Sequence, residues 1–182
     1  MIFSPTSLQG SYLIELEPFS DERGWFARFY CKDEFSKKIG HQKEWLQLNH
    51  SFTQKQGALR GLHFQRAPFR EIKMVRCIAG AVYDVLVDLR KDSPTFLNYF
   101  GAELSAENKK MMYIPEGFAH GFQCLTGSCE LIYHHTELYT PNAEGGLRYD
   151  DPILGIQWPA EVTDLSARDA SHPYLNENFK GI

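Results

Sequence analysis

The feature that most constrains the fold of this chain is a series of short apolar or alternating runs between turn residues. The runs lie at residues 12–16, 25–30, 45–49, 59–64, 72–78, 82–89, 96–104, 111–115, 120–125 and 129–135. Many short strands with frequent Gly, Pro, Asp and Ser turns predict an antiparallel β-sandwich or barrel. Helical spacing is confined to Lys32–Ile39, where Phe35 and Ile39 lie four residues apart, and to one turn near Ser166.

Length and charge narrow the class of protein further. A chain of 182 residues predicts one domain, and its net charge of −4 lacks the basic footprint of a nucleic-acid-binding protein. Asp84 and Asp88 interrupt the most apolar segment, so we expect no membrane span. Residues 1–10 have no basic region before an apolar run, and the four cysteines form no CxxC pair, so we expect no signal peptide, reduced thiols and a cytoplasmic location.

The run at 82–89 predicts a strand with one face in the core. Tyr83, Val85 and Val87 share one face by the two-residue period, and the opposite face carries Asp84 and Asp88 among apolar residues. Such a face is typical of a barrel interior around a polar ligand. The alternative is that the two aspartates cap a solvent-exposed face.

The run at 59–65 holds the first candidate for chemistry. Gly61 and His63 share one strand face, and a strand glycine often admits a ligand or another backbone. Histidine is the natural general base near neutral pH, so His63 is the candidate base. The alternative is a structural histidine.

A metal site is a second hypothesis. Residues 115–120 form PxGxxH, which resembles the second metal motif of the cupin barrels. The first cupin motif has HxH, whereas this chain has Gln65 two residues after His63. On paper His63, His120 and Glu71 supply the three protein ligands of a catalytic zinc.

Three further residues have a functional and a structural interpretation. Lys73 lies in a mostly apolar strand, where it either stabilises an oxyanion or extends its charge to solvent. Tyr133 is either a proton donor or a core aromatic. Asp169 either orients an imidazole or completes the capping box that begins at Ser166.

Taken together, the motifs resemble those of the dTDP-4-dehydrorhamnose 3,5-epimerases over about residues 8–175. The ordered set is DERGWF at 21–26, QLNHS at 47–51, LRGLHFQ at 59–65, KMVRC at 73–77, DVLVDLR at 84–90, SPTF at 93–96, LSAEN at 104–108, IPEGFAHGF at 114–122 and LSARD at 165–169. The resemblance implies a cupin-type jelly roll with one or two short helices, a homodimer, and no metal or organic cofactor. Its core is expected at about 8–158, with 159–182 packing back to supply Asp169.

The resemblance also implies the reaction and the site. The substrate is a nucleotide-diphospho-4-keto sugar, whose ketone acidifies the hydrogens on C3 and C5, and we expect inversion at C3, at C5 or at both. Carried over by motif, His63 is the base with Asp169 as its partner, Lys73 holds the enolate oxygen, and Tyr133 is the opposing acid. The implied binding residues are Arg23, Gln47, Asn49, Arg60, His120, Tyr139, Glu144 and Arg168, with Arg23 near the dimer interface.

Position 28 departs from the family pattern. Arg28 stands where the family usually has a Glu that contacts the nucleotide base, so we expect weaker selection for dTDP over CDP. Arg168 and His134 replace lysines, which leaves the epimerisation chemistry intact. Two other classes stay open at this point: a metal-dependent cupin enzyme, and a non-catalytic jelly roll that binds a nucleotide sugar or carbohydrate.

Overall fold

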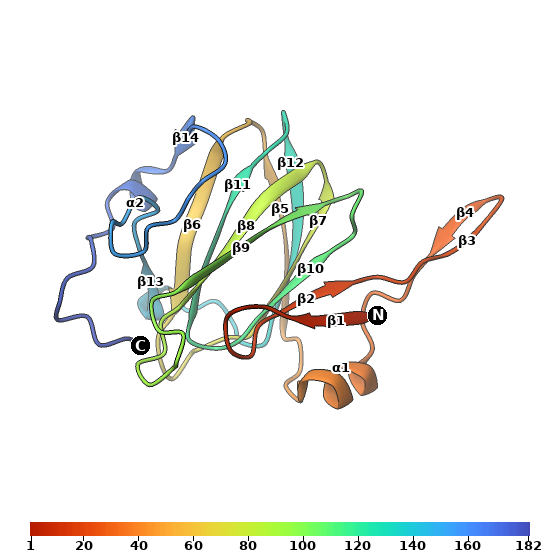
Figure 1. Cartoon of the computed structure of the whole chain (residues 1–182), viewed down its shortest axis with the longest axis horizontal. Coiled ribbons are helices and arrows are strands. Elements are labelled where there is room, and N and C mark those ends of the chain that lie inside the picture. The colour runs from red at the N-terminus through yellow and green to blue at the C-terminus, as the bar shows by residue number, and fades with distance from the viewer.

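The computed structural model describes all of residues 1–182 and consists mainly of two facing β-sheets (Figure 1). The first sheet has the order β1 (Ile2–Pro5), β2 (Tyr12–Glu15), β10 (Met111–Ile114), β7 (Lys73–Ala79), β12 (Cys129–His135) and β5 (Gln47–Thr53). The second has the order β13 (Glu144–Gly146), β6 (Ala58–Gln65), β11 (Phe118–Cys124), β8 (Ala81–Asp88) and β9 (Tyr99–Ser105), and β14 (Asp164–Leu165) pairs in parallel with β6. This architecture confirms the predicted all-β sandwich.

Two short α-helices accompany the sheets. α1 (Lys32–Ile39) has the predicted bounds, because Phe35 is fully buried and Gly40 ends the helix in the left-handed conformation with φ 69°. α2 (Ala167–Ala170) begins after Ser166, at the predicted helical turn. A 3₁₀ turn, η1 (Pro141–Ala143), precedes β13. No helix is long and apolar enough to span a membrane.

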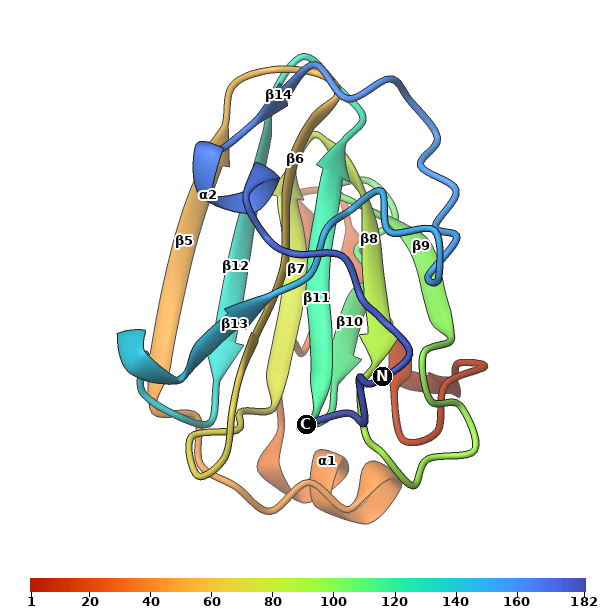
Figure 2. The same cartoon turned by 90° about the vertical axis from the view of Figure 1, so that its left-hand side faces the viewer.

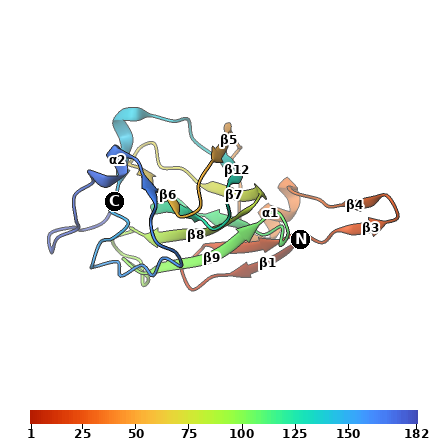
Figure 3. The same cartoon turned by 90° about the horizontal axis from the view of Figure 1, so that it is seen from above.

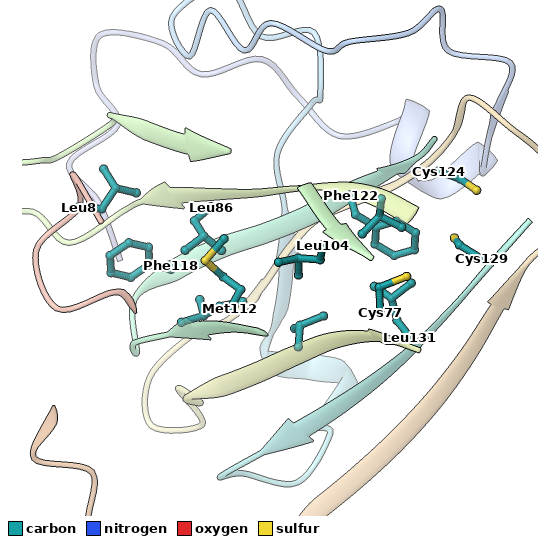
Figure 4. Close-up of a cluster of buried hydrophobic side chains, with 13 residues drawn as sticks. Leu8, Cys77, Leu86, Leu104, Met112, Phe118, Phe122, Cys124, Cys129 and Leu131 are labelled. Atoms are coloured by element: carbon teal, nitrogen blue, oxygen red, sulfur yellow. The ribbon is translucent and has the colours of Figure 1, made fainter. Parts of the chain in front are cut away.

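The main core fills the space between the sheets, as Figure 4 shows. Val82 and Leu86 of β8 belong to it, whereas Val85 and Val87 lie in a second cluster on the outer face of β8. Leu175 and Phe179 of the C-terminal segment pack against that second cluster. β8 is therefore buried on both faces: the predicted core face packs in the second cluster, and the face that carries the aspartates packs in the main core.

The carboxylates of β8 lie on its inner face. Asp84 and Asp88 are fully buried, so the alternative that they cap an exposed face is wrong. Asp88 accepts hydrogen bonds from Arg90, Ser93 and Thr95 at the end of the strand. Asp84 lies deeper and faces the end of the sandwich that holds the candidate site.

The structure differs from the prediction at 25–30. Only Gly24–Phe26 forms a strand, β4, which pairs with β3 (Phe19–Asp21) in a hairpin that projects from the body (Figures 1 and 3). Phe29 and Tyr30 instead pack in the third apolar cluster beside α1. The apolar alternation there serves packing under a helix rather than pairing in a sheet.

Two glycines set the spacing of the central strands β6 and β11. A Cβ on Gly61, whose φ is +120°, would lie 2.5 Å from the Cα of Gly121, and a Cβ on Gly121 would lie 2.7 Å from the carbonyl oxygen of Arg60. The glycine of the 59–65 run therefore admits the backbone of β11. This close approach places His63 opposite His120 in the strand register.

Candidate active site

A cavity of about 680 Å³ opens at one end of the sandwich. Strands β5, β6, β7, β11 and β12 contribute to its wall, and residues 164–169 close one side, where β14 and α2 lie beside β6 (Figure 2). The predicted site residues that line it are Asn49, Arg60, His63, Lys73, His120, Tyr133, Arg168 and Asp169. The fold thus brings together predicted site residues that are up to 120 positions apart in the sequence.

His63 and Asp169 form a hydrogen-bonded pair. Nε2 of His63 lies 2.7 Å from Oδ1 of Asp169, and the Gly61 N–H donates to Oδ2 at 3.2 Å. Burial alone would raise the pKa of Asp169, but the hydrogen bond and charge of His63, with the Gly61 N–H, lower it to about 2. The ionised carboxylate fixes one imidazole nitrogen and leaves Nδ1 as the free one.

Asp169 reaches His63 because α2 is capped beside β6. The Asp169 N–H donates to Oγ of Ser166 at 3.0 Å, so Ser166 is the N-cap that the sequence suggested. The side chain of Asp169 points to His63 at the same time. Both interpretations of Asp169 therefore hold: its backbone N–H takes part in the helix cap, and its carboxylate pairs with His63.

A second histidine–carboxylate pair lies on the neighbouring strands. Nε2 of His120 is 2.7 Å from Oδ1 of Asp84, and both side chains are almost fully buried. Oδ2 of Asp84 has no hydrogen-bond partner within the protein. Sequence reasoning identified Asp84 as a buried carboxylate but not as the partner of His120, because β8 and β11 are far apart along the chain.

Tyr133 faces this pair from the opposite sheet. Its ring centroid lies 6.3 Å from that of His120, and its hydroxyl is 3.1 Å from Oγ of Ser51. Burial raises the pKa of Tyr133 above its ordinary value, and the hydrogen bond with Ser51 only partly offsets this. The phenol therefore stays protonated and able to donate.

Lys73 belongs to a polar chain along the first sheet. Its Nζ lies 2.9 Å from Oε1 of Glu71, whose Oε2 is 2.7 Å from Nδ1 of His135. Nε2 of His135 is 3.3 Å from Nδ2 of Asn49. Burial alone would raise the pKa of Glu71, but His135 and Lys73 lower it, so the carboxylate is charged and holds Lys73 in place.

The remaining predicted binding residues lie around the rim of the cavity. Tyr139 donates from its hydroxyl to Oε2 of Glu144 at 3.0 Å, and Arg168 pairs with the same carboxylate. The amide oxygen of Gln47 accepts from the Tyr139 N–H at 3.1 Å. These contacts connect Gln47, Tyr139 and Glu144 to Arg168 in the wall, although the first three do not line the cavity themselves.

Two predicted residues lie outside the cavity of their own chain. Arg23 sits at the turn of the projecting hairpin, where it pairs with Asp21 and its side chain is 85% exposed. Arg28 pairs with Glu34 of α1 at 2.6 Å and is also exposed. Neither arginine lines the cavity of its own chain.

The metal set suggested by the sequence is not assembled. His63, His120 and Glu71 each bind a different partner, namely Asp169, Asp84 and His135. The ligand atoms that do lie within 4.8 Å of one another belong to His63, Asp169 and His172. His172 had no motif to identify it, because its neighbour His63 is more than 100 residues away in sequence.

Comparisons with known proteins agree on one family. The family model described as dTDP-4-dehydrorhamnose 3,5-epimerase matches residues 5–177. The chain is 44% identical to the dTDP-4-dehydrorhamnose 3,5-epimerase of Salmonella typhimurium (strain LT2) over 97% of both chains.

Solved structures give the same result. The chain superposes on dTDP-4-dehydrorhamnose 3,5-epimerase from Elizabethkingia anophelis NUHP1 with a TM-score of 0.93, at 38% identity over 98% of each chain. It also superposes on dTDP-6-deoxy-D-glucose-3,5-epimerase from Legionella pneumophila in complex with dTDP-4-keto-L-rhamnose, with a TM-score of 0.90. That match is 38% identical and covers 95% of this chain and 92% of the other.

Proposed function

Because this chain belongs to the dTDP-4-dehydrorhamnose 3,5-epimerase family, we propose that it inverts C3 and C5 of a dTDP-linked 4-keto-6-deoxy sugar in its cavity. The observation that carries the assignment of roles is the placement of His63, Asp169, Lys73 and Tyr133 around one space of about 680 Å³. The chemistry needs a base, an oxyanion stabiliser and an opposing acid, and these four side chains supply all three.

His63 removes the proton. The C4 ketone acidifies the hydrogens on C3 and C5, and the Nδ1 lone pair of His63 takes one of them while Nε2 stays bonded to Asp169. The electron pair of the broken C–H bond moves towards C4 and places negative charge on the ketone oxygen. The buried carboxylate of Asp169 stabilises the imidazolium that forms.

Lys73 and Tyr133 complete the inversion. The ammonium group of Lys73, held by Glu71, stabilises the enolate oxygen. Tyr133 lies on the sheet opposite His63 and returns a proton to the other face of the sugar ring. The reaction is redox-neutral and regenerates both groups after proton exchange with solvent, so it requires no metal or organic cofactor.

The binding roles follow from positions around the cavity. Arg60, which donates to Thr53 and to the carbonyl of Phe52, offers its remaining guanidinium N–H groups to the diphosphate. His120 contacts the sugar. Asn49 and Gln47 contact the nucleotide, as do Tyr139, Glu144 and Arg168 at the rim, where Tyr139 has an exposed ring for stacking.

A homodimer explains the exposed apolar surface. Phe19 and Phe26 of the projecting hairpin are 77% and 74% exposed, and Leu48 and Phe52 of the edge strand β5 and Leu46 just before it are each more than half exposed. In the proposed dimer the hairpin packs on a second copy of the chain, and Arg23 reaches the phosphates in the partner's cavity. We also propose a cytoplasmic location, since all four cysteines are unpaired thiols.

Solvent exchange tests the reaction. The protein is incubated in D₂O with dTDP-4-keto-6-deoxyglucose, and deuterium at C3 and C5 is followed by NMR. Incorporation at both carbons with formation of the rhamno isomer is expected, and at least about 100-fold slower exchange in His63→Ala. Binding without exchange would favour the non-catalytic jelly roll, and activity that is lost with a chelator and restored by a metal would favour a metal-dependent enzyme.

Subunit complementation tests the dimer. Arg23→Ala and His63→Ala chains are prepared separately, and each is expected to be nearly inactive. When they are mixed and allowed to exchange subunits, activity should return, because one cavity of the hybrid then has an intact His63 and an intact Arg23 from the other chain. A monomeric mass in solution, or no recovery of activity on mixing, would overturn the proposed contact between the hairpin of one chain and the cavity of its partner.

A further inference from the structure

His172 lies against the proposed base without a role in the proposed reaction. It follows α2 by two residues, and its ring centroid is 6.2 Å from that of His63 at an interplanar angle of 73°. The ligand atoms of His63, Asp169 and His172 all lie within 4.8 Å of one another. Two imidazoles and one ionised carboxylate therefore meet beside the cavity, which His63 and Asp169 line and His172 does not.

We propose that His63, Asp169 and His172 form an inhibitory binding site for a divalent transition-metal ion such as Zn²⁺. This donor set is one that Zn²⁺ takes when three protein ligands leave a fourth position for water. Zn–N and Zn–O bonds of about 2.1 Å require ligand atoms about 3.4 Å apart in a tetrahedron, so small side-chain rotations suffice. The inhibitory effect rests on the proposed role of His63; the binding itself does not.

The ring of His172 packs against Gly146, which leaves room for it because it has no side chain. A Cβ on Gly146 would lie 2.1 Å from Nε2 of His172, so the ring occupies the space that any side chain at position 146 would fill. Nε2 of His172 is buried and has no hydrogen-bond partner within the protein. His172 is thus held by packing beside His63, and no hydrogen bond of its own competes with a metal.

Arg168 is the group that opposes metal binding. Its Nε lies 3.5 Å from Oδ1 of Asp169, and its Nη2 lies 3.3 Å from Nε2 of His63. Both carboxylate oxygens of Glu144 accept hydrogen bonds from Nη1 of the guanidinium group. Arg168 can stay with Glu144 when an ion enters, but its charge lowers the affinity, so loss of that charge should strengthen binding.

Coordination of a metal ion by His63 leaves this residue unable to act as the base. A neutral imidazole has one N–H and one lone pair. If the metal binds Nε2 of His63, the single proton resides on Nδ1 and no lone pair faces the sugar. If the metal binds Nδ1, it occupies that lone pair directly. In both cases the C–H bond of the substrate cannot be broken by His63.

Cobalt provides a direct readout of the site. The protein is first treated with EDTA and dialysed, and Co²⁺ is then titrated while its visible ligand-field absorption is recorded. We expect one bound ion in the wild type and an affinity at least about tenfold lower in His172→Ala and His172→Gln. His50→Ala is the matched control, because His50 is exposed and pairs with Glu130 away from the cavity. Arg168→Gln should bind more tightly than the wild type.

Inhibition is measured separately. Zn²⁺ should stop deuterium exchange in the wild type reversibly with EDTA, while His172→Ala keeps its exchange activity at the same Zn²⁺ concentration. Absent Co²⁺ binding, or binding that does not depend on His172, would overturn the metal site. If the wild type catalyses no exchange at all, the proposed function fails, but the cobalt titration still decides the site.

Discussion

Nε2 of His120 lies 2.7 Å from Oδ1 of the fully buried Asp84, one strand away from the similar pair of His63 and Asp169. Asp84→Asn keeps the size of the side chain but removes the charge that orients His120. A hydrogen bond to a charged group contributes about 1.5–3 kcal/mol, so kcat/KM should fall roughly 10- to 100-fold. If His120 holds the sugar, KM rises more than kcat falls; an unchanged KM would contradict that role.

Asp169 links the site to acid stability. Its pKa falls from 3.8 to about 2 in the folded chain, so its ionised form stabilises the fold by about 2 kcal/mol at neutral pH. This stabilisation is complete above about pH 4 and is lost as the pH falls towards 2. Asp169→Asn should therefore unfold at lower urea concentration at pH 7, with the difference vanishing near pH 2. Ser166→Ala removes the cap and only the smallest of the contacts that lower the pKa of Asp169, so it should cost about 1 kcal/mol with much weaker dependence on pH.

Tyr133→Phe separates proton removal from proton return. The phenol is absent, but His63, Asp169 and Lys73 are intact, so substrate hydrogen should still exchange while the inverted product is lost. Mass spectrometry for exchange and NMR for configuration distinguish the two events. Ser51→Ala, which removes only the partner of the Tyr133 hydroxyl, should retain most of the inversion. Wild-type inversion by Tyr133→Phe would mean that another group is the acid.

Glu71 should act by positioning Lys73. In Glu71→Gln the ammonium group of Lys73, which lines the cavity, loses its charged partner at 2.9 Å, and the hydrogen bond from His135 is weakened. We expect kcat to fall about tenfold, less than the roughly 100-fold cost of removing an oxyanion donor outright, as in Lys73→Ala. Glu71→Asp, which keeps the charge, should recover part of the rate. Equal rates for wild type and Glu71→Gln would exclude the positioning role.

Arg28 should weaken the preference for dTDP. A guanidinium group only donates, so it cannot accept from thymine N3–H as a carboxylate can, whereas it can donate to the O2 and N3 acceptors of cytosine. We expect Arg28→Glu to increase the ratio of kcat/KM for dTDP- over CDP-linked substrate. Glu34→Gln, which frees Arg28 from its ion pair, is the matched control. A wild-type preference for dTDP above about 100-fold, or 2.7 kcal/mol, would contradict the idea.

The pattern of apolar residues predicted a strand well where each of its faces is uniformly buried or uniformly exposed along its length. β6, β7, β8, β11 and β12 follow the predicted runs closely, since alternation or continuous apolar character is a direct consequence of a sandwich core. Four strands were not predicted, because they are only two to four residues long and lack apolar alternation: β1, β3, β13 and β14. The prediction at 25–30 was wrong after Phe26, because Phe29 and Tyr30 pack beside α1 instead of continuing the strand.

The site could not be assembled from spacing. Asp169 is 106 positions from His63, and only the pairing of β14 with β6 brings α2 to that strand. The family resemblance supplied the pairing of His63 with Asp169, whereas the partners Asp84, Glu71 and His172 follow from the three-dimensional structure alone. Partners that lie on separate strands leave no periodic trace in a single sequence.

The contact between Gly61 and Gly121 limits how this site can evolve. Both residues occupy one crossing point, so a methyl group at either position would push apart the strands that carry His63 and His120. Neither position can be enlarged first and the other adjusted later, because both already lack a side chain. New substrate preferences are therefore more accessible through the rim residues and the projecting hairpin, where substitutions leave the separation of the two histidines unchanged.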